Sequence, residues 1–154
     1  MSIQLAIKHK TIEKVIEIAA SREKVWEILI DDRFASRWYG EFSLGAKPRT
    51  TWEEGSKVLF TDLSGGGLVG EVMINQPNQM LSVEYQGVVF GGEEDYTSED
   101  AMSVKGGEET YIITDKDGQT ELSVKADVMP EYFDSMSSAW ERALKNIKLL
   151  AEEM

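Results

Sequence analysis

The chain has 154 residues, and its 42% hydrophobic and 29% charged residues are typical of a folded globular protein rather than a disordered one. Its 28 acidic residues outnumber its 16 basic ones and give a net charge of −12, so we expect no binding to nucleic acid or to an anionic membrane surface. Cysteine is absent, which excludes disulfides, thiolate metal sites and a cysteine nucleophile.

Targeting signals are not visible in the sequence. Charged side chains interrupt the apolar residues of positions 1–20, so the apolar segment of a secretory leader is missing. No stretch approaches 18 consecutive apolar residues, so we expect no membrane insertion. The length suits one domain over residues 1–154. We therefore expect a cytoplasmic protein of a single domain.

The first part of the chain predicts a strand followed by two short helices. Residues 11–19 alternate between apolar and charged side chains, which is typical of a half-buried strand. Ser21 is a candidate N-cap, and apolar residues at positions 25–30 recur at helical spacing. Asp31 and the aspartate after it favour a break in the helix. A second short helix is predicted over residues 34–39.

Residues 41–127 predict successive strands joined by turns. The clearest alternation runs over residues 81–86, and Asp117-Gly118 is a strong signal for a hairpin turn. Residues 91–107 break the alternation with four glycines and a run of acidic side chains. We expect this segment to be a long acidic, glycine-rich loop.

The last element of the chain is predicted to be a long helix. From residue 131 to 153, apolar residues recur at positions i, i+3, i+4 and i+7, which is the pattern of a long amphipathic helix. Consecutive strands with short connections form antiparallel sheets, so the fold class is α+β. The wide apolar face of the helix needs a concave surface. We expect a curved antiparallel sheet of about six or seven strands around it.

Six short segments together resemble the START-like SRPBCC superfamily, and within it the branch named after the activator of heat-shock protein 90 ATPase homologue 1. The segments are ASREKVW (20–26), RWYG (37–40), GEV (70–72), QP (76–77), LSVEY (81–85) and WERAL (140–144). This resemblance implies a helix-grip fold with a cavity between the sheet and the C-terminal helix, which holds a hydrophobic molecule in many members. The acidic segment 91–107 departs from the family pattern.

Three motifs that suggest a cofactor or metal are better explained by turns and surface. The glycines of residues 65–70 match G-x-G-x-x-G, but the residues after them are of β type, whereas a dinucleotide site needs a helix there. The calcium-like start at Asp115 lacks the ligands expected at positions 5 and 12 of such a loop. The single histidine, His9, is expected on the surface. We predict no cofactor and no metal site.

Paired carboxylates offer few candidates for acid–base chemistry. Neighbouring residues on a strand point to opposite faces, so doublets such as Glu108 and Glu109 rarely form a catalytic pair. We expect most of these side chains to be solvated at the surface. The sequence therefore assigns no catalytic residue and favours a binding module over an enzyme.

Aromatic residues spread over the elements around the expected cavity are the candidate ligand-binding residues. Their rings and hydroxyl groups can line an apolar pocket, or they can simply fill a solid core. The resemblance, not the spacing, favours the pocket. The candidates are Trp38, Phe60, Tyr85, Tyr111, Phe133, Met136 and Trp140.

The sequence is compatible with three functions. The leading one is the binding of a hydrophobic or amphipathic small molecule by a monomer or weak dimer. The alternatives are a co-chaperone-like domain that binds a chaperone or basic protein, and a cyclase-type cavity enzyme. Residues 93–109 hold seven acidic residues and one lysine, so half of the net charge lies beside the expected cavity mouth. A cationic ligand group or a basic protein is the specific partner to test there.

Overall fold

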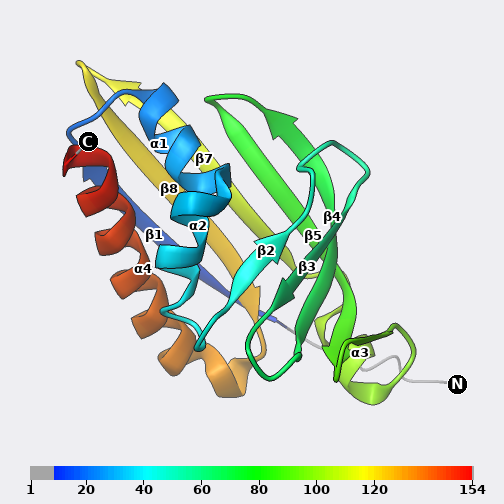
Figure 1. The fold of residues 1–154 in the computed structure, drawn as a ribbon. Helices are drawn as coiled ribbons and strands as arrows, with labels where there is room; N and C mark the ends of the chain where they lie inside the picture. Colours follow the sequence, from blue (N-terminus) through cyan, green and yellow to red (C-terminus); the bar gives the residue numbers. More distant parts are fainter. Residues whose placement is uncertain (1–8, 154) are drawn as a thin grey trace, which may run out of the picture.

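The computed structural model describes residues 9–153, which form a curved antiparallel sheet with helices on its concave side (Figure 1). Each hydrogen-bonded pair of neighbouring strands is antiparallel. The strand order is β1 (Lys10–Ile18), β8 (Gln119–Val128), β7 (Glu108–Lys116), β5 (Met80–Phe90), β4 (Gly67–Gln76), β3 (Lys57–Thr61) and β2 (Lys47–Arg49), with the short β6 (Glu93–Asp95) paired to β5.

The long central strands β4 and β5 bend through two irregularities in their pairing. The register shifts between Val69 and Gly70, and again between Val72 and Ile74. A Cβ atom on Gly70 would lie 2.8 Å from the backbone oxygen of Glu84, so only glycine permits this close approach of the two strands. Bulges of this kind increase the local twist and let a sheet curve. The curvature creates the concave face on which the helices lie.

Three helices cover that face. After a 3₁₀ turn over Pro130–Tyr132, α4 (Phe133–Glu153) packs on β1 and on the two short helices α1 (Arg22–Ile30) and α2 (Asp32–Tyr39). The buried stripe of α4 follows the predicted helical spacing and consists of Ala139, Trp140, Ala143, Leu144, Ile147 and Ala151. The α+β class, the curved sheet of about seven strands, the helix pair after the first strand and the helix-grip arrangement are confirmed.

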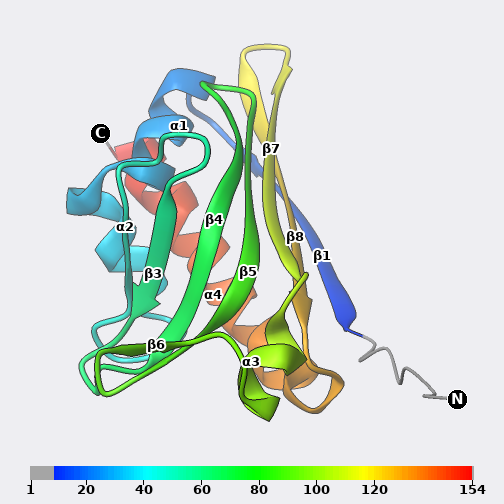
Figure 2. The ribbon, with the colours of Figure 1, turned by 90° about the vertical axis from the view of Figure 1, so that its right-hand side faces the viewer.

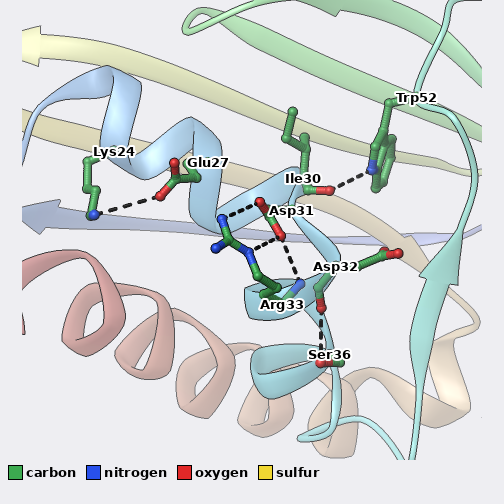
Figure 3. A network of polar contacts seen from close by, with 8 residues as sticks. All are labelled: Lys24, Glu27, Ile30, Asp31, Asp32, Arg33, Ser36 and Trp52. Carbon is green, nitrogen blue, oxygen red and sulfur yellow. Dashed lines mark hydrogen bonds and ion pairs between the residues drawn. The ribbon is translucent and has the colours of Figure 1, made fainter. Parts of the chain in front are cut away.

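The predicted break between the first two helices occurs at Asp31, which ends α1 and caps α2 (Figure 3). Its carboxylate accepts hydrogen bonds from the backbone N–H of Arg33 at 2.9 Å and from the Nη2 of the same residue at 2.8 Å. These bonds from Arg33 hold the pKa of Asp31 at about 2, below its usual 3.8. The indole of Trp52 donates to the carbonyl of Ile30 at 3.0 Å and ties the end of α1 to the loop before β3.

The glycine-rich motif and the hairpin turn behave as predicted. The glycines of residues 65–70 lie in the turn between β3 and β4 and at the start of β4, with no helix after them. Asp117 and Gly118 both have positive φ, 53° and 86°, which is the geometry of a tight type I′ connection between β7 and β8. Both segments are therefore connections between neighbouring antiparallel strands.

The expected loop over residues 91–107 is wrong in part, because the segment contains β6 and a short helix, α3 (Glu99–Val104). Ser98 caps α3 by accepting a hydrogen bond from the backbone N–H of Ala101 at 3.1 Å, and Ala101 is fully buried. Because the segment is rich in acidic residues and glycine, its composition did not indicate a helix. The helix is nevertheless capped at Ser98 and fixed to the fold by the buried side chain of Ala101. Figure 2 shows α3 at the end of the sheet where α4 begins.

Within residues 9–153, no helix combines the length and the apolar character that crossing a bilayer requires.

Candidate functional site

A cavity lies between the concave face of the sheet and the N-terminal half of α4. Its volume is about 160 Å³, and most of its wall is apolar. The apolar side chains come from the loop after α2, from β3, β4 and β8, and from α4. They include Phe42, Phe60, Leu68, Val128, Met136 and Trp140. We call this space the inner cavity.

A second space of about 490 Å³ adjoins the inner cavity, and we call it the outer cavity. The two share walls formed by Leu68, Tyr85, Val128 and Met136. The outer wall comes from α3, from the 3₁₀ turn before α4 and from the end of β5. It includes Asp127 at the end of β8, the acidic residues Asp100 and Glu131, the half-buried Val104, and the exposed Phe90 and Tyr132. The acidic segment therefore forms one side of the cavity mouth.

The charged group of the inner cavity is a single carboxylate held by three tyrosines. Glu109 is only 5% exposed. Tyr85 donates its hydroxyl hydrogen to Oε1 at 2.6 Å, and Tyr39 donates to Oε2 at 2.6 Å. Tyr111 donates to the same Oε2. A buried carboxylate is costly unless it is hydrogen-bonded, and these three hydroxyls meet that need. We call these four residues the Glu109 cluster.

Strand pairing places the cluster. Glu109 and Tyr111 are two residues apart on β7, so their side chains share the inward face. Glu109 pairs with Val83 on β5, and Tyr85 lies two residues further on the same face of that strand. Tyr39 enters from the last residue of α2. Three elements that are far apart in sequence thus meet at one carboxylate.

The tyrosines of the Glu109 cluster are neutral hydrogen-bond donors. Burial is the main cause that raises the pKa of Tyr39, Tyr85 and Tyr111 well above the ordinary 10.0, and the negative charge of the Glu109 carboxylate raises it further. A carboxylate offers about four acceptor positions, and the tyrosines fill three. Because Glu109 also lines the cavity, its remaining acceptor capacity is open to a molecule inside.

The structure brings together some of the predicted site residues but not all. Phe60 and Trp140 line the inner cavity, while Tyr85 and Met136 line both cavities. Tyr111 reaches the site through its hydrogen bond to the Glu109 carboxylate.

Two predicted residues lie elsewhere. Trp38 does not line the cavity; it is buried behind it, stacks on Tyr39 with ring centres 4.0 Å apart, and donates its indole N–H to the carbonyl of Ile28 at 3.0 Å. Phe133 does not line either space, and Lys10 places its ammonium 4.5 Å from the centre of that ring. Both residues are part of the surrounding framework.

The central residue of the site was missed. Most of the paired carboxylates were expected at the surface, and Glu109 is an exception, because β7 begins at Glu108 and turns the next side chain inward. The rule for doublets itself holds, since Glu108 is exposed and Glu109 points inward. Extending the alternation of Tyr111 and Ile113 back by one step would have identified Glu109 as an inward residue. Tyr39 and Phe42 carried no comparable signal.

His9 also lies differently from the expectation. It is half-buried rather than free on the surface, and it lines the outer cavity. Its Nε2 lies 2.8 Å from the carbonyl oxygen of Ser103 on α3. A carbonyl oxygen can only accept, so Nε2 carries a proton and donates. The residues described in the structure contain no group of three or more His, Asp or Glu arranged to hold a metal ion.

Comparison with known families agrees with this architecture. The model of one family, described as Activator of Hsp90 ATPase homolog 1-like protein, matches residues 19–152. The chain belongs to this family. Curated proteins give no match to it in sequence. Among solved structures, protein MLL2253 from Mesorhizobium loti is similar with a TM-score of 0.74 and 17% identity, over 94% of this chain and 98% of that one.

Two further solved structures share this fold. The Aha1 dimer from Colwellia psychrerythraea has a TM-score of 0.69 and 19% identity, over 93% of this chain and 96% of that one. DynU16, described as a protein in the dynemicin biosynthetic locus, has a TM-score of 0.65 and 15% identity, over 90% of this chain and 45% of that one. Identities this low establish a shared fold.

Proposed function

We propose that this family member binds a hydrophobic or amphipathic small molecule in the adjoining inner and outer cavities. The observation that carries the proposal is a largely apolar cavity with one polar cluster at its wall. Small-molecule sites are usually concave and apolar, with a few placed polar groups that orient the ligand. Each buried Å² of apolar ligand surface would contribute about 25 cal/mol. The Glu109 cluster would then fix which end of the ligand enters first.

The outer cavity supports an amphipathic rather than a purely apolar ligand. Its wall combines apolar side chains such as Val104 and Met129 with the carboxylates of Asp100 and Glu131. The buried Ala101 and the contact of His9 with Ser103 hold α3 against the body of the fold. In this proposal α3 and the 3₁₀ turn form the rim over which the ligand enters.

A proton-transferring cavity enzyme of the cyclase type is the second candidate, because a buried carboxylate faces the cavity. With their pKa raised, Tyr39 and Tyr85 keep their protons, so Glu109 is the group that would accept one from a bound substrate. Mass analysis of each compound recovered after incubation distinguishes the two functions. A binding protein returns the compound unchanged, whereas an enzyme returns an altered one.

A co-chaperone-like interaction is the remaining alternative, and it rests on the family description and on the acidic segment. In that segment Glu94 already pairs with Lys57 at 2.7 Å, and the carboxylate of Asp95 accepts hydrogen bonds from the backbone of Thr97 and Ser98. A partner protein would perturb surface residues and would bind with strong dependence on salt. A ligand in the cavity would instead perturb the residues that line the inner and outer cavities.

Native mass spectrometry of freshly purified protein tests the binding proposal. We expect either a co-purified compound or added octanol or octylamine to appear as a mass increment on the unmodified chain. Met136→Trp places a larger side chain between the inner and outer cavities and should abolish that increment. Leu149→Trp, on the exposed side of the same helix, is the matched control and should retain it. Equal uptake by both variants would place the ligand elsewhere and refute the proposal.

A further inference from the structure

The inner end of the cavity is negative, and no basic side chain balances it. Among residues 9–153, neither lysine nor arginine lines either cavity, and His9 in the outer cavity is the single basic side chain there. The Glu109 carboxylate receives only neutral phenol hydroxyls. Hydrogen bonds from neutral donors satisfy a carboxylate but do not cancel its charge. The charge therefore remains available to a bound molecule.

We propose that the ligand carries a cationic nitrogen, such as a protonated amine, that binds the Glu109 carboxylate while its apolar part fills the cavity. This inference rests on the proposed binding function and specifies its ligand class. An ammonium group would use the acceptor capacity on Glu109 that the tyrosines leave open. Charge-assisted hydrogen bonds are shorter and stronger than neutral ones, and a low-dielectric cavity strengthens them further.

The three tyrosines make Glu109 a fixed acceptor rather than a mobile side chain. Tyr39 and Tyr111 hold Oε2 and lie 3.1 Å apart, hydroxyl to hydroxyl, while Tyr85 alone holds Oε1. The less occupied oxygen is thus Oε1, on the side of Tyr85, which is a wall shared by both cavities. A cation entering from the outer cavity meets this oxygen first. Preorganised acceptors lose little freedom on binding and favour selectivity.

Acidic residues at the mouth add to the same preference. Asp100, Asp127 and Glu131 line the outer cavity. Asp127 already accepts hydrogen bonds from the hydroxyl of Thr11 at 2.6 Å and from the backbone N–H of Glu108 at 3.0 Å. A mouth lined by one sign of charge raises the local concentration of the opposite ion and repels anions. Fatty acids and phosphorylated compounds are therefore disfavoured at both ends of the site.

The experiment compares head groups on identical apolar skeletons. The probes are octylamine, octanol and octanoate, with 1-naphthylmethylamine and 1-naphthylmethanol as a second skeleton, measured at neutral pH by tryptophan fluorescence and calorimetry. We expect each amine to bind at least tenfold more tightly than its alcohol, and octanoate to bind most weakly. Glu109→Gln should remove most of the preference for the amine and leave only the smaller part that the acidic mouth contributes. Glu108→Gln, which changes the outward neighbour on the same strand, should leave the full preference in place.

The outcomes separate this inference from the function on which it rests. Binding of amine and alcohol with equal affinity would overturn the cationic ligand and leave a hydrophobic binding protein in place. Retention of the full preference in Glu109→Gln would move the recognition away from Glu109 and would also overturn it. Failure of every probe to bind would refute the binding function itself. The ranking of probes on the unmodified chain decides the matter even where a variant does not fold.

Discussion

Replacement of Trp140 by alanine is expected to lower the free energy of unfolding by about 3–5 kcal/mol, the usual cost of truncating a large buried aromatic side chain. Trp140 is almost fully buried on α4. Its ring lies 4.8 Å from the ring of Phe42, 5.9 Å from that of Tyr111 and 6.3 Å from that of Trp38, measured between centres. Truncation to alanine would enlarge the inner cavity and would remove the packing of the indole ring against Phe42, Tyr111 and Trp38.

Urea denaturation followed by circular dichroism measures this loss. Leu149→Ala is the matched control because Leu149 is 53% exposed on the same helix, and substitutions at such positions change stability by about 0.5 kcal/mol or less. A loss below about 1 kcal/mol for Trp140→Ala would mean that the helix does not pack on the aromatic cluster as described.

Alkaline solution should destabilise the fold through the Glu109 cluster. The pKa values of Tyr39, Tyr85 and Tyr111 are raised well above 10.0 in the folded chain, chiefly by burial and next by the charge of Glu109. Groups with a raised pKa stabilise the fold fully below their unfolded pKa, and this contribution is lost as pH rises above it. Three tyrosines releasing protons on unfolding would lower the free energy of unfolding by about 4 kcal/mol per pH unit above pH 10.

Ultraviolet absorbance of tyrosinate, recorded together with circular dichroism, measures this effect. We expect the three cluster tyrosines to ionise within the unfolding transition rather than before it. Tyr85→Phe should reduce the pH slope by about one third, because one of three protons is removed. Tyr132→Phe, at an exposed position, should not change it. Ionisation of all five tyrosines while the fold persists would contradict the burial of the cluster.

Much of the fold was predictable because its patterns are strictly periodic. The apolar residues Leu81, Val83 and Tyr85 alternate along β5 and are all buried, and the buried stripe of α4 follows helical spacing from Ala139 to Ala151. In β1, Lys14 interrupts the alternation of apolar and charged residues. Its Nζ forms an ion pair with Oε1 of Glu141 on α4, at 3.0 Å. One such exception does not change the prediction of a strand, because Ile12 and Ile18 on the same face of β1 are buried.

The site was harder to predict because it depends on contacts between distant segments. Glu109 is charged and belongs to a doublet, so its composition indicated the surface, and only the inward register of β7 buries it. Tyr39 reaches it across 70 residues of sequence, which no local pattern encodes. Trp38 and Trp140 are equally aromatic and buried, yet only Trp140 borders the cavity. Which aromatic side chains surround a cavity depends on packing that the sequence alone does not specify.

The four tryptophans offer the most direct test of the central claim, that the cavity beneath α4 receives the ligand. Each indole N–H gives its own signal in a ¹⁵N–¹H correlation spectrum. Trp140 lines the inner cavity, whereas Trp52 lies outside both cavities and donates to the carbonyl of Ile30. Titration with octylamine and with octanol should shift the indole signal of Trp140 and leave that of Trp52 in place. Saturation without a shift at Trp140, or shifts confined to residues 93–105, would contradict the account.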